Sequence, residues 1–175
     1  MTHGCQLKSE PVAMLAKMPT GLAFYVAVAV LGTRAIVFAA PAVAHTPQDV
    51  QALVERAVAH IRDVGRERAF ADFSRPDGGF VDGELYVYCD AADGTVIAHG
   101  GNPHLVGVNL LNVRDPDGKL PNVEMRRIAF TQGSGWLEFR WPDPATKRIE
   151  LKNAYVLKVD DNTMCGSGYY KASRP

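Results

Sequence analysis

The stretch of residues 86–110 constrains the fold more than any other part of this chain, because it predicts two paired strands followed by a polar loop. Residues 85–89 and 95–99 are rich in β-branched and aromatic side chains. The connection 90–94 between them has hairpin length and ends in a glycine. The sequence therefore predicts a β-hairpin in which His99 lies where a sheet meets a loop.

An amphipathic helix is predicted ahead of the hairpin. Thr46 is a good N-cap residue with a proline directly after it, and apolar residues then recur at helical spacing from Val50 to Val64. We expect the helix to continue past Gly65 as far as Phe73, where a run of turn residues begins. Its apolar stripe needs a cover, and the strands that follow can provide one.

Three more strands and a second helical piece are predicted after the hairpin. Residues 100–134 are rich in Gly, Asn, Pro and Asp and contain a helical pattern at 122–132. Strand-like runs follow at 135–141, 153–159 and 163–170. The predicted order is helix, hairpin, long crossover and three-stranded meander, which is an α+β arrangement in one domain.

The first 44 residues have the pattern of a secretory signal peptide. Residues 21–31 are apolar, two lysines precede them, and Pro41-Ala-Val-Ala44 supplies small residues in the A-x-A spacing of a signal-peptidase site. We expect cleavage after Ala44, which leaves a single domain of residues 45–175 in the periplasm or outside the cell.

An uncleaved membrane anchor is the alternative for this segment. Residues 22–44 reach the length of about 20 residues that a bilayer span needs, but Arg34 near the middle opposes insertion by about 3 kcal/mol. In that case the domain would be anchored to the membrane. A translation start at Met14 would shorten the segment before the apolar run and give a more ordinary signal.

The charge balance argues against a nucleic-acid partner. Residues 1–44 hold three of the 19 basic and one of the 19 acidic residues, so the expected mature domain carries a net charge of −2. Both signs are mixed along it, and aromatic residues do not alternate with basic ones. This pattern is typical of an ordinary solvated surface.

The sequence of the predicted domain resembles the single Cache domain family, whose members are extracytoplasmic relatives of PAS domains. The resemblance includes the stretch 86–110, covers residues 46–172, and is carried further by four short motifs: Gly133-Ser-Gly-Trp136, Trp141-Pro-Asp-Pro144, Lys152-Asn-Ala-Tyr155 and Cys165-Gly-Ser-Gly-Tyr-Tyr-Lys171. It implies a PAS-like fold, in which a long N-terminal helix packs on a five-stranded antiparallel sheet with a long crossover between strands two and three. The sequence stops at Pro175, directly after the last predicted strand, so we expect a free-standing sensor domain.

A disulfide between Cys89 and Cys165 is compatible with export, because an oxidising compartment permits one. Both cysteines fall in predicted strands. The resemblance to PAS-like sheets implies that the first and last strands lie side by side at the centre. Two buried free thiols are the alternative, since free cysteine behaves as a small apolar residue.

Strand alternation sorts the first strand into two faces. Leu85, Val87 and Cys89 point one way, and we assign this apolar face to the helix. Tyr86 and Tyr88 then face the crossover. In the Cache family the face under the crossover is the ligand pocket, and such pockets often hold carboxylates or amino acids. Both lines of reasoning therefore place a ligand pocket beside the two tyrosines.

Five further side chains complete the expected ligand-binding set. We expect His99 to donate a hydrogen bond to an anionic ligand, and Lys152 to supply a compact cation for a carboxylate. Trp141 is expected in the pocket wall, and Tyr170 is expected to close the pocket from the last strand. Tyr155 is expected to contribute its hydroxyl, with a place for its ring in the core as the alternative. The alternative for His99 is a surface histidine in a glycine-rich turn. The alternative for Lys152 is an exposed lysine at the start of a strand.

Metal, cofactor and enzymatic patterns are weak. His99 and His104 lack a carboxylate placed to complete a metal site, and no cofactor is implied. Ser134 and Ser167 each stand in Gly-Ser-Gly rather than in the Gly-x-Ser-x-Gly of a nucleophile elbow. We therefore expect a protein without catalytic activity.

The predicted function is that of an exported sensor domain that binds a small carboxylate or amino acid. It would signal its occupancy to a partner, such as a membrane receptor or transporter. One alternative is a structural adaptor that forms a homodimer through the helix of residues 47–73 and has no ligand. An exported hydrolase is a third class. Since one fold hosts many functions, the architecture alone does not choose among them.

Overall fold

Residues 45–171 are the part of the chain that the structure, a computed structural model, describes. The expected signal peptide, its cleavage site and the alternative membrane anchor all fall in residues 1–44 and lie outside the described residues. Within 45–171, no helix is both long enough and apolar enough to span a membrane.

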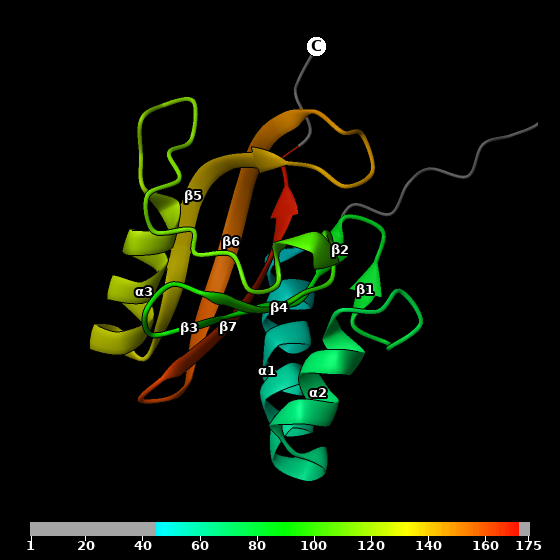
Figure 1. The fold of residues 1–175 in the computed structure, drawn as a ribbon. Coiled ribbons are helices and arrows are strands. Elements are labelled where there is room, and N and C mark those ends of the chain that lie inside the picture. The colour runs from blue at the N-terminus through cyan, green and yellow to red at the C-terminus, as the bar shows by residue number, and fades with distance from the viewer. Residues whose placement is uncertain (1–44, 172–175) are drawn as a thin grey trace, which may run out of the picture. The chain divides into compact units, whose positions relative to one another are not determined.

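Two helices cover one face of the sheet, where the sequence predicted a single long one. α1 spans Pro47–Val64 and α2 spans Arg66–Phe73, and the chain turns between them at Gly65. The expectation that one helix continues past Gly65 was wrong. This residue adopts a φ of 83°, a conformation that glycine reaches readily and that ends a helix. α1 and α2 therefore lie side by side (Figure 1).

The start of α1 follows from its sequence. The Thr46 hydroxyl accepts a hydrogen bond from the Asp49 backbone N–H at 3.2 Å, and the Asp49 carboxylate accepts one from the Thr46 backbone N–H at 2.8 Å. This capping box satisfies donors that a first helical turn leaves free. The predicted apolar stripe is buried, and its members are Val50, Leu53, Val54, Ala57, Val58 and Ile61.

The sheet has the predicted number of strands and the predicted crossover. Its strands are β3 (Tyr88–Ala91), β4 (Val96–His99), β5 (Ser134–Pro142), β6 (Ile149–Asp160) and β7 (Thr163–Tyr170). They are antiparallel in the spatial order β4-β3-β7-β6-β5, so the first and last of these strands lie next to one another. The predicted α+β architecture is confirmed.

The predicted strand at 85–89 is divided in the structure. Leu85–Tyr86 form β2, which pairs with β1 (Val81–Asp82) in a separate two-stranded sheet, and Val87 lies between β2 and β3. The alternation of faces nevertheless persists through the break. Leu85 and Val87 pack under α1 and α2, whereas the side chains of Tyr86 and Tyr88 join the apolar cluster on the opposite face.

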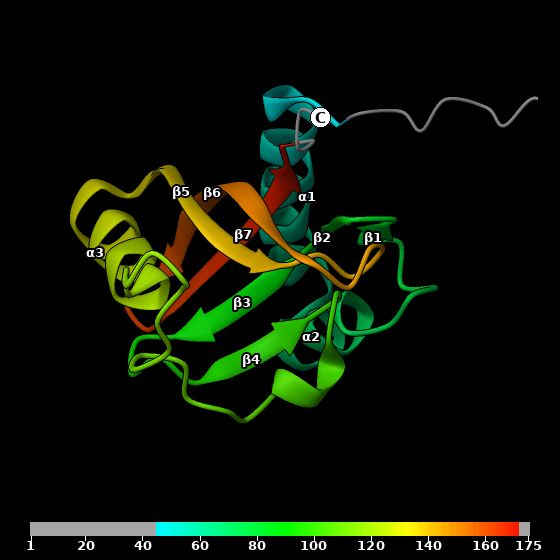
Figure 2. The same ribbon diagram turned by 90° about the horizontal axis from the view of Figure 1, so that it is seen from above.

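The crossover from β4 to β5 covers that opposite face of the sheet (Figures 1 and 2). It contains η1, a 3₁₀ turn at Pro103–Leu105, and α3 at Pro121–Gln132. Met125, Ile128 and Ala129 of α3 are buried against the sheet. The sheet thus separates a core under α1 and α2 from a second core under the crossover.

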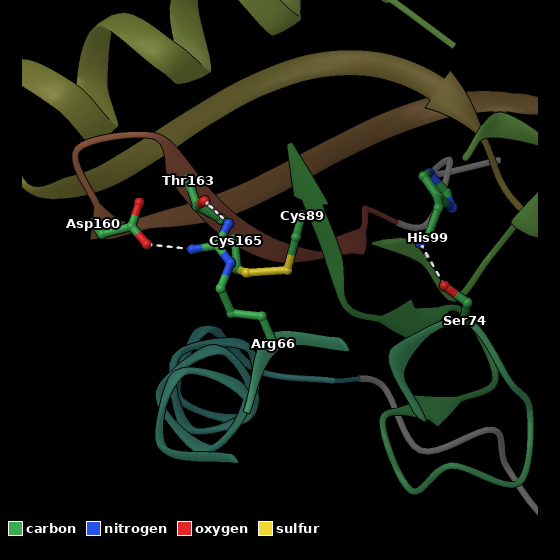
Figure 3. Close-up of a disulfide and its surroundings, with 7 residues drawn as sticks. All are labelled: Arg66, Ser74, Cys89, His99, Asp160, Thr163 and Cys165. Carbon is green, nitrogen blue, oxygen red and sulfur yellow. Dashed lines mark hydrogen bonds and ion pairs between the residues drawn. A yellow bond between two sulfur atoms is a disulfide. The ribbon is translucent and has the colours of Figure 1, made fainter. Parts of the chain in front are cut away.

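Cys89 of β3 and Cys165 of β7 are direct partners at the centre of the sheet and are joined by a disulfide (Figure 3). Both residues are fully buried. Close to them, Arg66 at the start of α2 pairs with Asp160 and donates a hydrogen bond to the Thr163 hydroxyl. The disulfide and this ion pair together tie the central strands to one another and to α2.

Candidate ligand pocket

A cleft and a small inner chamber lie between the sheet and the crossover. The cleft has a volume of about 670 Å³ and the chamber one of about 20 Å³. Tyr86, His99, Leu110 and Trp141 line both, so the chamber is the inner end of the cleft. As it stands, the chamber holds a group about the size of one water molecule.

Strand register brings the side chains of the chamber together. Lys152 of β6 lies opposite Tyr170 of β7 on one side and opposite Phe139 of β5 on the other. Tyr88 of β3 lies opposite His99 of β4. Direct partners on neighbouring strands share one face of a sheet, so these side chains all lie on the face under the crossover.

Lys152 is a buried cation without an ion-pair partner among residues 45–171, and it is only 1% exposed. Its Nζ lies 3.8 Å from the centroid of the Tyr86 ring, 5.0 Å from that of Tyr170 and 5.6 Å from that of Tyr88. Burial lowers the pKa of Lys152 to about 7, and the charge of Asp143 opposes that fall. Near neutral pH, an anion that enters the chamber favours the protonated lysine.

His99 is held as a neutral hydrogen-bond donor. Its Nδ1 accepts a hydrogen bond from the Asn102 backbone N–H at 2.9 Å, so Nε2 carries the ring proton of the neutral form. Burial, together with the charge of Lys152, lowers the pKa of His99 to about 3. Its backbone N–H donates to the Ser74 hydroxyl at 3.3 Å, which ties the end of β4 to the end of α2 (Figure 3). His99 lines both cavities and can therefore donate from Nε2 to a ligand.

The tyrosines are neutral and fix the shape of the chamber. The Tyr86 and Tyr170 hydroxyls are 3.3 Å apart, and the Tyr170 hydroxyl donates to the Pro142 carbonyl at 2.8 Å, so Tyr86 is the donor of the pair. The Tyr88 hydroxyl donates to Met125 Sδ of α3 at 3.0 Å. Burial raises the pKa of Tyr86 to about 12 and that of Tyr88 well above its usual value.

Two glycines of β7 make room for these side chains. A Cβ at Gly168 would lie 2.8 Å from Lys152 Cε, and a Cβ at Gly166 would lie 2.6 Å from the Tyr88 hydroxyl. Ser167 between them is fully buried and donates a hydrogen bond to the Tyr86 carbonyl at 2.8 Å. The two glycines therefore leave the space that the Lys152 and Tyr88 side chains occupy, and strand alternation alone could have indicated that these glycines share a face.

Most of the predicted ligand residues lie together. Five of the seven line the chamber: Tyr86, Tyr88, His99, Trp141 and Lys152. Tyr170 contacts the hydroxyl of Tyr86 and the ammonium of Lys152 beside it. Their role in ligand binding stays a prediction.

Tyr155 does not reach the chamber, and its predicted place in the pocket is corrected. Its ring lies 5.2 Å from that of Trp136, in the core under α1 and α2. The reason is elementary, because residues three apart on a regular strand point to opposite faces. Since Lys152 faces the crossover, Tyr155 of the same strand faces the helices.

Five chamber residues were missed, namely Asp90, Leu110, Asn122, Met125 and Phe139. Asp90 was assigned to a turn, although it follows Tyr88 by two positions and β3 runs on to Ala91. Its shared face with Tyr88 was the signal that could have found it. Asn122 and Met125 belong to α3, and no sequence pattern says where a crossover helix meets a sheet.

The residues considered for metal binding and catalysis lie in ordinary settings. His104 is exposed in η1. In the described part of the chain, no three His, Cys, Asp or Glu side chains are placed to share a metal ion. Ser134 and Ser167 both lie in strands, so neither occupies the strand-to-helix turn of a nucleophile elbow.

Sequence comparison connects this architecture with chemoreceptors and sensor kinases. Residues 42–170 match the family model described as Single Cache domain 2. The methyl-accepting chemotaxis protein McpP of Pseudomonas putida and the sensor histidine kinase MctS of Rhizobium johnstonii are each 32% identical over 90 residues. Each match covers 51% of this chain, but it spans only 16% of the chemotaxis protein and 19% of the kinase.

Solved structures show the same fold. A methyl-accepting chemotaxis protein from Vibrio parahaemolyticus aligns with a TM-score of 0.62 at 19% identity, over 70% of this chain and 86% of that one. A Cache chemosensory domain, solved to explain its recognition of carboxylic acid, aligns with a TM-score of 0.60 at 23% identity, over 70% of this chain and 91% of that one. A periplasmic sensor domain of a chemotaxis protein aligns with a TM-score of 0.57 at 28% identity, over 69% of this chain and 86% of that one.

Proposed function

The chain belongs to the single Cache domain family, and on that premise we propose that it is an exported sensor domain whose chamber binds a small carboxylate. Its relatives include a chemotaxis protein and a sensor kinase, and one structural neighbour recognises a carboxylic acid. Those facts support a sensing role. The choice of a carboxylate rests on this chain's own residues.

The observation that carries the proposal is the buried Lys152. Removing an ammonium from water costs several kcal/mol unless an anion or other polar groups compensate. Here the groups around it are mainly aromatic rings, and Tyr86 is the nearest of these at 3.8 Å. A carboxylate beside Lys152 Nζ would supply the missing negative charge, so part of the binding free energy comes from relieving an unfavourable feature of the unliganded protein.

His99 provides the second contact in this proposal. Its neutral Nε2–H donates to one carboxylate oxygen while Lys152 pairs with the other, which fixes the ligand's orientation. A phosphate is a poorer fit. It carries up to two negative charges, whereas the chamber holds one lysine whose pKa is about 7 and also contains Asp90.

The size of the chamber supports a conformational signal. A volume of about 20 Å³ is too small for a carboxylic acid of several carbons. Leu110 of the crossover lines both the chamber and the cleft. We propose that ligand binding moves the crossover relative to the sheet, and that a partner such as a membrane receptor or transporter distinguishes the two arrangements.

Export is part of the same proposal. The buried disulfide between Cys89 and Cys165 supports an oxidising compartment. The N-terminal residues that would direct export carry the sequence pattern of a signal peptide. Cleavage of a fusion between residues 1–60 and a periplasmic reporter, followed by N-terminal sequencing, would test the expected cut after Ala44.

Thermal unfolding with matched small molecules tests the ligand class. Propanoate should stabilise the purified domain increasingly with concentration, by about 2.7 kcal/mol when the acid is at a hundred times its Kd. Propanamide has the same shape but no charge and should give no such shift. Equal shifts with acid and amide would contradict the proposed role of charge. A tight dimer that responds to no acid would instead favour the structural adaptor.

A further inference from the structure

The chamber has a second polar end that the proposed carboxylate contacts do not use. Asp90 of β3 and Asn122 at the start of α3 both line it, and each is only 3% exposed. Lys152 Nζ lies nearer to the ring of Tyr86 than to that of Tyr88. Asp90 lies beyond Tyr88, two residues and about 7 Å farther along the strand. The cation and these two groups therefore stand toward opposite ends of the chamber.

Asn122 has an unused hydrogen-bond donor. Its Nδ2 is buried and makes no hydrogen bond to any group within residues 45–171. Buried amide groups in folded proteins nearly always have a partner, so each exception needs an explanation. Because Asn122 lines the chamber, a ligand atom that accepts a hydrogen bond would provide that partner.

Asp90 supplies an acceptor beside this donor. Its carboxyl group makes no side-chain hydrogen bond in the described part of the chain, although the residue is buried. Burial raises the pKa of Asp90 to about 7, and the charge of Arg126 opposes that rise. A ligand group that donates a hydrogen bond would therefore satisfy Asp90. A ligand group that accepts a hydrogen bond would satisfy Asn122.

A hydroxyl group on the ligand's carbon chain meets both requirements, because it donates and accepts at the same time. An ammonium group only donates and leaves Asn122 Nδ2 without an acceptor, while a methyl group satisfies neither residue. We propose that the pocket selects short hydroxycarboxylates, with Asp90 and Asn122 as the residues that recognise the hydroxyl. This inference rests on the proposed carboxylate function for the lysine end of the chamber.

Isothermal titration of the wild-type domain with matched three-carbon acids tests the inference without any substitution. The probes are propanoate, 2-hydroxypropanoate, 3-hydroxypropanoate, 2-aminopropanoate and 3-aminopropanoate. At least one hydroxy acid should bind about tenfold or more tightly than propanoate, as a hydrogen bond to a buried charged group predicts. Both amino acids should bind more weakly than the better hydroxy acid.

Two substitutions that keep the number of non-hydrogen side-chain atoms assign the effect to residues. Asn122→Leu removes the donor and Asp90→Leu removes the acceptor, and each should bring the affinity ratio of hydroxy acid to propanoate close to one. Saturable binding of propanoate shows that a variant is folded. The ratio within each variant is the readout, because loss of the Asp90 charge also changes the Kd for propanoate itself. If either variant fails to fold, the wild-type series still decides the matter.

Each outcome has a separate meaning. Equal affinity of propanoate and both hydroxy acids would overturn the hydroxyl preference and leave the carboxylate proposal intact. Tighter binding of an amino acid than of either hydroxy acid would also overturn it. If none of the five acids binds, the proposed function fails and the inference fails with it.

Discussion

Lys152 Nζ lies 3.8 Å from the centroid of the Tyr86 ring, which is closer than it lies to the rings of Tyr88 or Tyr170. A cation–π contact of a desolvated ammonium contributes about 2 kcal/mol, whereas burial of the charge costs several kcal/mol. The rings therefore offset only part of that cost. Protonation of Lys152 and binding of an anion are expected to be coupled for this reason.

The affinity for a carboxylate should fall as the pH rises above 7. The pKa of Lys152 is about 7 before an anion binds, and deprotonation removes the positive partner. The pKa of Asp90 is also about 7, so this residue gains a negative charge over the same pH range. That charge also lowers the affinity for a carboxylate as the pH rises. His99, with a pKa of about 3, stays neutral throughout.

Titration calorimetry with propanoate checks this pH dependence. Deprotonation of Lys152 by itself should raise the Kd about tenfold for each pH unit well above the pKa of this lysine, because the protonated fraction of Lys152 falls by that factor. A Kd that stays constant from about pH 6 to about pH 9 would show that Lys152 is not the anion partner.

His99 should remain neutral with its proton on Nε2 across the physiological range. Burial and the charge of Lys152 lower its pKa to about 3, and its Nδ1 is occupied as an acceptor from the Asn102 N–H. Imidazole ¹⁵N chemical shifts, followed by NMR from about pH 5 to about pH 8, should show no titration. A change in the His99 ¹⁵N shifts that follows a protonation curve within this range would contradict the assignment.

Gly168→Ala should abolish ligand binding and destabilise the fold. The new Cβ would lie 2.8 Å from Lys152 Cε and 2.7 Å from the Asn153 carbonyl oxygen, and the backbone atom cannot move away cheaply. Overpacking of this kind typically costs about 1–3 kcal/mol. Urea unfolding and propanoate titration measure the two effects.

Gly133→Ala is the matched control for this substitution. Gly133 has a φ of 83° and no atom within 4 Å of a Cβ, so alanine there introduces backbone strain far from Lys152. This variant should lose stability while keeping the wild-type Kd. A Gly168→Ala protein that binds propanoate normally would show that the Lys152 side chain can shift without loss of binding.

Removal of the disulfide should lower stability without changing affinity. The bond between Cys89 and Cys165 closes a loop with a sequence separation of 76 residues, for which chain entropy predicts about 4 kcal/mol. The double variant Cys89→Ala/Cys165→Ala should therefore unfold at a lower urea concentration than the oxidised protein. Both cysteines lie in the core on the helix side, so the Kd for propanoate should be unchanged. Equal urea midpoints before and after reduction of the wild type would contradict this account.

Strand periodicity predicted much of the site because both sides of the pocket are built on regular strands. Tyr86 and Tyr88 were placed under the crossover by alternation from Leu85 and Val87, and the side chains lie there. The same rule, applied to β6, would have excluded Tyr155 once Lys152 was chosen. The spacing of Lys152 and Tyr155 in the sequence therefore already separates the two side chains.

Other features depend on contacts that no local pattern encodes. The helical spacing of apolar residues continues on both sides of Gly65, so the turn between α1 and α2 arises from packing and from the conformational freedom of glycine. Likewise, Asn122 reaches the chamber because α3 packs across β5, β6 and β7. The sequence predicts that helix but not its position on the sheet.

Lys152→Met tests the central claim most directly. Methionine has a similar length and no charge, so the unliganded variant should be at least as stable as the wild type, since replacing a buried charge with an apolar side chain is often neutral or stabilising. Propanoate should then bind the wild type in a titration and show no detectable binding to the variant. A Lys152→Met domain that keeps the wild-type Kd for propanoate would contradict the account, because the buried lysine would then not be the partner of the carboxylate.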